Sequence, residues 1–585
     1  MKRKLIQYPV FLVIFFSTFS LHAQINDNIW FDGFSRSYFT RDALDKSLTD
    51  DTISARNTSN GYNLLDLNTH VNPIQNIEIF AQLRIRNSFG SFFGSGTEIN
   101  VRQLKAKGVI NNKIRFSIGD LFLKQSKFTL YNYDEELLSY EHDMLKFYRD
   151  IIHYENFYIE NRWRLQGIQT DFSFKFDRFI RNLDLDFFIT RPRGSVQINE
   201  SNYSSDLIFS GGSMLSNINK RLTLSTNYVN LFELASSGTK NISVRNPVYD
   251  VSLIHRFSNE KYHIQQTLQT GFSKRYWLHT ELENAISDSI SNDIQGMFFE
   301  LENKFDKQDS SLFLSLGVRY VDPNFRSAGA QSRRLDYNAI NNNTIYPFYT
   351  NMSLIRPQSM FDIVSDDKLY NQDLSSVLMN FNPIYSNVLP YGDATPNRIG
   401  VYMKAIMNNK NNLFHAKINT GIFKEAIGQG TPKKRQFGLV KGAFKINIHE
   451  FLNWQKELNI SASSESELTK RGGKDVSKIN FFSHHMNASI NAELAKKFFV
   501  QASYKQLNAK GNEFVTQRDS YGNISYFTLT EVDQKDHMLS FGMLYKFKKN
   551  IYANLNYNWW GVTSFDQNYL NYKYNRLILI LSVKL

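Results

Sequence analysis

The chain of 585 residues contains no cysteine, only 11 prolines and, after its first residues, no apolar run long enough to span a membrane as a helix. Without cysteine there is no disulfide framework, no thiolate metal site and no attachment point for a lipoprotein anchor. The formal net charge is +13, but the basic residues are spread along the chain and form no recognisable nucleic-acid-binding module. We therefore expect no nucleic-acid partner.

The N-terminus has the features of an export signal. Lys2, Arg3 and Lys4 precede an apolar stretch over residues 10–21, and Ala23 and Gln24 follow shortly after it. A basic region, a short apolar region and a small residue at the cleavage point define a secretory signal peptide. We expect cleavage between Ala23 and Gln24, so that residues 1–23 are the signal peptide and residues 24–585 the mature chain.

The main pattern of the mature chain is an alternation of apolar and polar residues with a period of two. Between 77 and 86, isoleucine, alanine and leucine alternate with Glu78, Gln82, Arg84 and Arg86, and similar segments occur at 312–320, 414–422, 486–494 and 551–559. A transmembrane β-strand needs about ten such residues. A soluble β-sandwich also alternates, but the persistence of the pattern and the Tyr and Trp at segment ends favour a membrane barrel.

Short and long connections alternate along the chain. The candidate short turns are residues 72–76, 111–112, 177–182, 216–220, 258–261, 306–310, 408–412, 449–455, 495–497 and 546–550. They predict a single all-β, antiparallel transmembrane barrel of about 22 strands, within a range of roughly 16 to 22. With the N- and C-termini in the periplasm, the short turns are periplasmic. The long loops are then extracellular, at 42–60, 122–160, 191–205, 280–291, 322–397, 464–481 and 509–533.

The last residues predict how the barrel closes. Leu577, Leu579, Leu581, Val583 and Leu585 occupy one face of an extended strand. A terminal strand that is apolar on its outer face is typical of outer-membrane barrels. We expect it to pair with the first strand, near residues 29–40.

The two largest loops, 122–160 and 322–397, are the candidates for a lid or a plug, because loops of this size tend to be functional or disordered. Apolar residues at helical spacing in the first loop predict a short amphipathic helix over the barrel mouth. Its acidic run at 134–143 is either a solvated charge run or a divalent-cation site. The candidate lid residues of the second loop are Arg333, Arg334, Tyr385, Tyr391 and Arg398, near a predicted turn at the rim that alternatively contacts a ligand.

No motif for catalysis, metal binding or a cofactor is present: the chain lacks a Gly-x-Ser-x-Gly elbow, a His-Glu-x-x-His helix and a phosphate-binding loop. His484 and His485 are adjacent on a strand, so they point to opposite faces and do not share one metal. Asp50-Asp51 and Asp366-Asp367 are the only candidates for an omptin-like protease, and Ser59-Asn60 for a phospholipase-like barrel. None has an identifiable partner, so we expect no enzyme and no cofactor.

The signal peptide, the alternating strands and the apolar terminal strand resemble outer-membrane β-barrel proteins of Gram-negative bacteria. The composition rich in Asn, Lys and Tyr and the Ala23-Gln24 junction resemble proteins of Bacteroidota. Asp51-Thr52-Ile53 and Asp288-Ser289-Ile290 are similar to the tripeptides that these bacteria O-glycosylate. The resemblance implies an outer-membrane location, contact with lipid and lipopolysaccharide, and insertion by the barrel-assembly machinery. An N-terminal plug domain like that of TonB-dependent transporters is not expected, because strand alternation begins almost directly after Gln24.

Two functional hypotheses follow. The first is a porin-like channel or passive transporter with a loop-gated lumen, in which inward Arg84, Arg86, Arg319 and Lys417 favour polar or anionic solutes. The second is a non-conducting structural subunit of an envelope complex for secretion, gliding or barrel assembly. Both use the same barrel.

Overall fold

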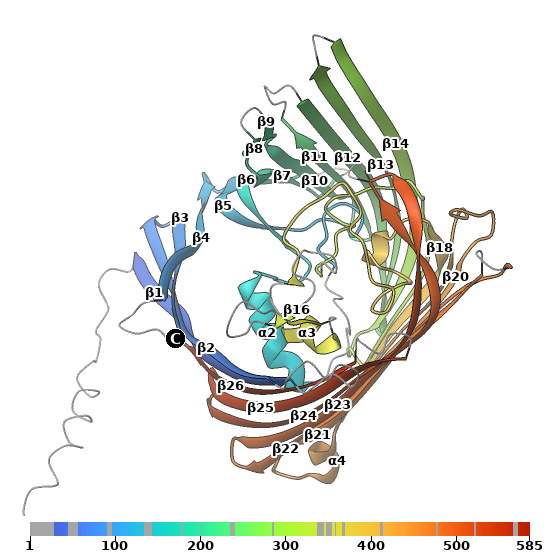
Figure 1. The fold of residues 1–585 in the computed structure, drawn as a ribbon. Helices are drawn as coiled ribbons and strands as arrows, with labels where there is room; N and C mark the ends of the chain where they lie inside the picture. Colours follow the sequence, from blue (N-terminus) through green and yellow to red (C-terminus); the bar gives the residue numbers. More distant parts are fainter. Residues whose placement is uncertain are drawn as a thin grey trace, which may run out of the picture.

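Figure 1 shows the computed structural model of the chain, which describes residues 28–44, 56–89, 96–133, 143–176, 180–199, 202–234, 240–283, 286–335, 344–346, 354–356, 359–365, 369–409, 413–474, 478–519, 522–565 and 571–585. The predicted signal peptide with Ala23 and Gln24, the tripeptide at Asp51, the acidic residues 134–142 and the Asp366-Asp367 pair lie outside the described residues.

The chain forms one closed antiparallel barrel of 22 strands, as predicted. The first half consists of β1 (Ile29–Leu44), β2 (Arg56–Ile74), β3 (Ile77–Ser88), β4 (Thr97–Ile110), β5 (Ile114–Leu123), β6 (Trp163–Lys175), β7 (Asn182–Arg193), β10 (Leu207–Asn217), β11 (Leu222–Glu233), β12 (Lys240–Ser258) and β13 (Tyr262–Glu283). The second half consists of β14 (Ile286–Lys307), β15 (Leu312–Val321), β18 (Arg398–Asn408), β19 (Phe414–Lys424), β20 (Gln436–Asn447), β21 (Leu458–Arg471), β22 (Ile479–Ala495), β23 (Phe498–Arg518), β24 (Ile524–Lys548), β25 (Ile551–Ser564) and β26 (Tyr572–Lys584).

The barrel closes where the sequence predicted. β26 pairs with β1, from Phe34 opposite Lys584 to Leu44 opposite Tyr574. On β26 the outward Leu579 and Leu581 are exposed, as expected for side chains that face lipid. The inward Ile578 and Ile580 are fully buried, so this strand is apolar on both faces, one toward lipid and the other toward protein inside the barrel.

Alternation of burial along the strands agrees with the predicted faces. On β15 the outward Leu316 and Val318 are exposed, whereas the inward Ser315 and Arg319 are buried. The exterior is therefore an apolar surface and the interior a polar one, as a membrane requires, because lipid offers no partner to polar side chains.

All ten predicted short turns join neighbouring strands at one end of the barrel. The β4–β5 turn contains Asn111 and Asn112, with φ of 50° and 56°, and asparagine tolerates this left-handed region better than most residues. The longest of these turns holds the short helix α4 (Ile448–Leu452).

Three of the predicted loops are wrong, because strands continue through them. β13 and β14 have 22 residues each and leave only residues 284–285 between them, so most of the predicted loop 280–291 is a hairpin and Asp288-Ser289-Ile290 lies in β14. Loops 464–481 and 509–533 shrink in the same way to 472–478 and 519–523. The inner faces of two of these segments pack against residues of the two largest loops, where Glu467 accepts a hydrogen bond from Asn387 and Ala509 belongs to one buried cluster with Tyr148. The sequences of the three segments are rich in polar residues, so the sequence alone predicts loops there.

The two largest loops fold into the barrel and form a plug, which we define as the described residues of 124–162 and 322–397. The plug contains the 3₁₀ helix η1 (Asp143–Leu145), α2 (Lys146–Glu155), the hairpin β16 (Thr344–Tyr346) and β17 (Leu354–Arg356), α3 (Met360–Ser365) and η3 (Gly392–Ala394). Figure 1 shows α2 and α3 inside the ring of strands. The first loop contains a helix, but α2 begins at Lys146, after most of the apolar residues on which the prediction rested. It lies inside the barrel and not over the mouth, because its buried Tyr148 and Ile152 pack against inward residues of the wall. β8 (Val196–Asn199) and β9 (Asn202–Ser204) form a small separate hairpin between β7 and β10.

The plug and the wall share a hydrophobic core on the side of β22–β26. Tyr148 and Ile152 of α2 and Phe361 of α3 belong to one buried cluster with Trp560 and Ile578 of the wall. Each large apolar side chain that is fully buried stabilises the fold by about 1.5–3 kcal/mol. On this side the plug is therefore an integral part of the folded barrel. None of the helices among the described residues is long and apolar enough to cross a membrane.

Candidate functional site

The C-terminal end of α2 is fixed to the wall by charged residues, which we call the arginine clamp. The clamp consists of Arg36 on β1, Asp66 on β2, Arg84 on β3, Arg102 on β4, and Tyr154 and Glu155 on α2. Glu155 forms ion pairs with Arg36 and Arg84, and Arg84 also donates two hydrogen bonds of 2.8 Å to the carboxylate of Asp66. Arg102 lies 3.2 Å from Asp66.

Within the clamp, the positive charges of the arginines and the negative charges of Asp66 and Glu155 compensate each other. Burial alone would raise the pKa of Glu155, but Arg36, Arg84 and Arg102 lower it below its ordinary value. The carboxylate therefore stays ionised and holds the helix to three wall strands. Removal of one partner of such a buried ion pair leaves the other charge uncompensated, which strongly destabilises the fold.

A second group of charges, the Asp393 latch, connects the other plug segment to the wall. Asp393 in η3 accepts a hydrogen bond of 2.8 Å from Arg319 on β15, and Arg319 also contacts Glu300 on β14 at 2.7 Å. Lys127 of the plug lies 2.5 Å from Glu300 and 3.7 Å from Asp393. Although burial raises the pKa of Asp393, Arg319, Lys404 and Lys127 together lower it well below its ordinary range.

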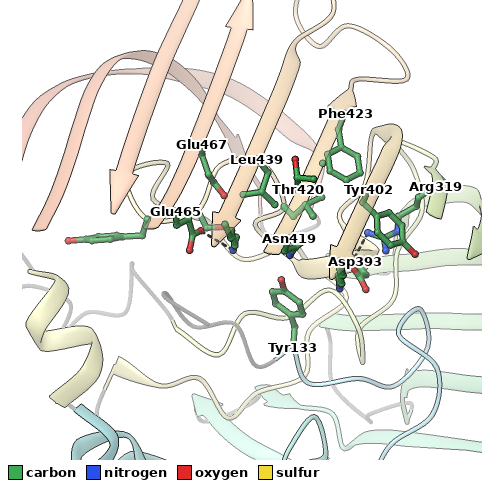
Figure 2. Close-up of a pocket in the computed structure, with 16 residues that line it drawn as sticks. Tyr133, Arg319, Asp393, Tyr402, Asn419, Thr420, Phe423, Leu439, Glu465 and Glu467 are labelled. Atoms are coloured by element: carbon green, nitrogen blue, oxygen red, sulfur yellow. Dashed lines mark ion pairs between the residues drawn. The ribbon is translucent and has the colours of Figure 1, made fainter. Parts of the chain in front are cut away.

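A narrow cavity lies between the plug and strands β15–β21, directly beside the latch. In Figure 2, Arg319 and Asp393 lie at one side of the cavity, Glu465 and Glu467 at the other, and Tyr133 of the plug faces the wall between them. Its volume is about 30 Å³, enough for one or two water molecules.

The lining of this cavity combines charged and amide side chains with aromatic and aliphatic ones such as Tyr402, Phe423 and Leu439. Lys404, Asn419 and Thr420 line it together with Lys441, whose ammonium group lies 2.8 Å from Glu465.

Towards β18–β21 the plug is attached to the wall by polar contacts and a small apolar cluster around Val388 and Tyr402. Glu467 accepts a hydrogen bond of 2.6 Å from the backbone N–H of Asn387 in the plug. Beside the latch, Phe128 and Ala394 of the plug belong to a larger buried cluster with Phe298 and Val321 of the wall.

The four predicted lumen-lining residues fall into two groups. Arg84 and Arg319 are inward and buried, and each is neutralised by carboxylates of the clamp or the latch. Arg86 lies over the ring of Tyr62, 4.2 Å from its centre, and Lys417 lies on the inward face of β19, opposite Ile406 and Ala443. Their effect on solutes stays a prediction.

The five predicted lid residues lie within the plug or at its junction with the wall. Arg333 donates a hydrogen bond of 2.7 Å to the carbonyl of Pro390, and Arg334 bonds to the carbonyl of Glu160. Tyr391 bonds to the carbonyl of Met379, Arg398 donates to that of Val388 at 2.8 Å, and Tyr385 is buried in the core with α2. The structure therefore gives each of them a structural contact within the plug.

Sequence reasoning missed Asp66, Glu155 and Asp393, the carboxylates on which the clamp and the latch depend. One signal pointed to them: an arginine at an inward position of a barrel strand needs a partner once the lumen is filled. Which acid supplies the charge depends on the fold.

No group of three metal-ligating side chains lies close together in the described part of the chain. The histidine pair is split between the faces of β22, as predicted. His485 is buried toward the plug, with Nε2 3.5 Å from the carbonyl of Ile384, and His484 lies beside Phe482 on the outer face.

No family model matches the chain, and no curated protein matches it. The fold is similar to solved structures over nearly its whole length. OpdL of Pseudomonas aeruginosa is 9% identical, with a TM-score of 0.33 and coverage of 95% of this chain and 99% of the other. A BenF-like porin from Pseudomonas fluorescens Pf-5 is 9% identical, with a TM-score of 0.32 and coverage of 96% and 99%. The outer membrane channel DcaP of Acinetobacter baumannii is 9% identical, with a TM-score of 0.26 and coverage of 95% and 97%. At these values the function of the chain has to be inferred from its own geometry.

Proposed function

We propose that the protein is a porin-like channel that passes small polar or anionic solutes between its plug and strands β15–β21. The observation that supports this proposal is the polar attachment of the plug on that side. Asp393 and Asn387 contact the wall through an ion pair and hydrogen bonds, which water can replace at a net cost of about 0.5–1.5 kcal/mol per hydrogen bond.

The apolar contact of the plug with β22–β26 opposes movement of the plug away from these strands. Moving the plug away from β22–β26 would expose the apolar cluster around Trp560 and Ile578, at about 25 cal/mol for each Å² of apolar surface. A movement at the latch also involves a second buried cluster, in which Phe128 and Ala394 of the plug pack with Phe298 and Val321 of the wall. The separable part of the plug, which acts as the gate, is therefore the part that faces β18–β21, where polar contacts such as that of Asn387 with Glu467 attach it.

Planar-bilayer recordings of the purified barrel test this function. We expect discrete ion conductance, an anion preference in a salt gradient, and a larger conductance after deletion of residues 322–397. If neither the intact barrel nor a correctly folded deletion variant conducts, the channel function is refuted.

The second candidate is a non-conducting subunit of an envelope complex. Its supporting observation is the apolar core between α2, α3 and the wall, because a plug fixed in this way can close the barrel permanently. Affinity purification from native membranes separates the two candidates: a partner in fixed stoichiometry favours the subunit, and an isolated barrel the channel.

The proposed location is the outer membrane of a Gram-negative bacterium of the Bacteroidota type, with both termini in the periplasm after cleavage at Ala23-Gln24. Lipopolysaccharide and the barrel-assembly machinery are the proposed contacts there. Cell fractionation and N-terminal sequencing of the mature protein test these assignments.

A further inference from the structure

Arg275 is a buried cation without a partner. It lies on the inward face of β13, only 1% exposed, and none of its three guanidinium nitrogens has a hydrogen-bond partner in the structure. It also forms no ion pair among the described residues. Arginine keeps its proton in proteins, and a buried charge without compensation is strongly unfavourable.

Two further arginines lie close to Arg275. Arg518, the last residue of β23, donates a hydrogen bond of 3.0 Å to the carbonyl of Gly522, and a Cβ atom on Gly522 would come within 2.3 Å of Nη1 of Arg275. Arg326 of the plug is tied by its backbone N–H to Ser273, at 2.8 Å. Ser273 precedes Arg275 by two residues and therefore shares its face of β13.

The like charges are concentrated enough to act on one another. Burial, and then the charges of Arg518 and Arg275, lower the pKa of Arg326. Nε of Arg326 is buried and lacks a hydrogen-bond partner in the structure.

Two carboxylates lie nearby: the charge of Asp519 acts on Arg275 and Arg518 and that of Asp322 on Arg326. Both carboxylates are also held in turns. Asp519 accepts a hydrogen bond of 2.8 Å from the backbone N–H of Asn523, and Asp322 accepts one of 2.8 Å from that of Asn324. Three arginines from β13, β23 and the plug thus converge where the acidic side chains are held by backbone groups.

We propose that Arg275, Arg518 and Arg326 form a binding site for one small oxyanion, the carboxylate or phosphate group of a solute, beside Gly522. The planar guanidinium of Arg275 can donate two parallel hydrogen bonds to such a group. Gly522 has a φ of 80° and lies so close to Nη1 of Arg275 that any side chain at this position would clash with the guanidinium.

This site names the solute class of the proposed channel, and in that sense it rests on the proposed function. Binding is nevertheless measured without conductance. A barrel that binds oxyanions but does not conduct would refute the channel function and support the binding site. A barrel that conducts but does not bind oxyanions would refute the binding site and support the channel function.

The test is isothermal titration calorimetry of the full-length barrel in detergent, with citrate and inorganic phosphate as probes and chloride as the spherical control anion. We expect saturable binding of citrate, phosphate or both, at least tenfold tighter than chloride. The tighter probe identifies the source as a carboxylate or a phosphate. Absence of saturable binding by both oxyanions would overturn the proposal.

Three variants locate the binding. Arg275→Gln should weaken binding at least tenfold, and Arg275→Lys should weaken it less because it keeps the charge. Gly522→Ala keeps all three arginines but places a methyl group against Nη1, and should also weaken binding. Arg115→Gln is the control, because Arg115 has 70% of its side chain exposed. Folding of each variant is checked by its heat-dependent shift in gel electrophoresis. Binding by folded Arg275→Gln equal to that of the control would overturn the site.

Discussion

The arginine clamp and the Arg275 site are two groups of three inward arginines in one barrel, and they differ in how directly carboxylates contact them. In the clamp, Asp66 and Glu155 contact Arg36, Arg84 and Arg102 directly. At the second site, Arg275 has no hydrogen-bond partner and no ion pair with the described residues. The comparison suggests two uses for the inward basic residues of this barrel: arginines paired with carboxylates fix the plug, and in the proposed site an arginine without a hydrogen-bond partner binds a small anion.

The largest change in the free energy of unfolding is expected for a substitution in the arginine clamp. Glu155→Gln leaves Arg36 and Arg84 buried with a weaker partner, so it should lower the free energy of unfolding by about 3–5 kcal/mol. Urea unfolding in lipid vesicles, followed by tryptophan fluorescence, measures this change. Glu160→Gln is the matched control because the Glu160 side chain is 69% exposed. Equal stability of the two variants would mean that the clamp does not hold the plug.

At the Arg275 site we expect a substitution to raise the free energy of unfolding and not to lower it. Without oxyanions in the buffer, Arg275→Gln removes an uncompensated charge and should raise the free energy of unfolding by about 1–3 kcal/mol, the cost of an unsatisfied buried polar group. Added citrate should stabilise the wild type but not this variant. Loss of stability in Arg275→Gln under both conditions would show that Arg275 is structural, like the clamp arginines.

The Asp393 latch should give a smaller effect, because Arg319 keeps Glu300 as a partner. Asp393→Asn should weaken the attachment of the plug by about 1 kcal/mol, seen as more frequent conductance fluctuations in bilayers. A recording indistinguishable from the wild type would place the gate elsewhere. Asn419→Asp, which alters the same cavity without touching the ion pair, is the control.

The same latch gives a pH prediction. The pKa of Asp393 is lowered from an ordinary value of 3.8, so its stabilising contribution is fully present above about pH 4 and is lost only as the pH falls further. Conductance fluctuations should therefore stay constant between pH 8 and pH 5 and increase below about pH 4. An increase already at pH 6 would contradict an ionised, arginine-bound Asp393.

The smallest effect is expected at Lys417, which lies on the inward face of β19 and away from the clamp and the latch. Lys417→Gln should leave stability within about 0.5 kcal/mol of the wild type and reduce anion selectivity slightly, measured as the reversal potential in a salt gradient. Lys113→Gln in an exposed turn is the control. A large loss of stability would group Lys417 with Arg84 and Arg319 instead.

Much of the barrel could be predicted from single residues and their neighbours. The alternation at Leu316 and Val318, the turn at Asn111 and Asn112 and the closing pair of strands depend on local patterns. The hairpin through Asp288 could not be predicted in this way, because its sequence is rich in Ser, Asp and Asn, which are typical of loops. Nor could the candidate site: Arg36 and Glu155 are separated by 119 residues, and Arg275 meets Gly522 only through the curvature of the barrel.

The sequence by itself determined a closed antiparallel barrel of 16 to 22 strands, because a membrane strand imposes a period of two and lipid admits no open edge. The tertiary structure alone decided that the two largest loops lie inside, that Ile578 and Ile580 pack against them, and which arginines have carboxylate partners. The physical reason is that charge compensation depends on distances of a few ångströms between residues far apart in the chain, which no local pattern encodes.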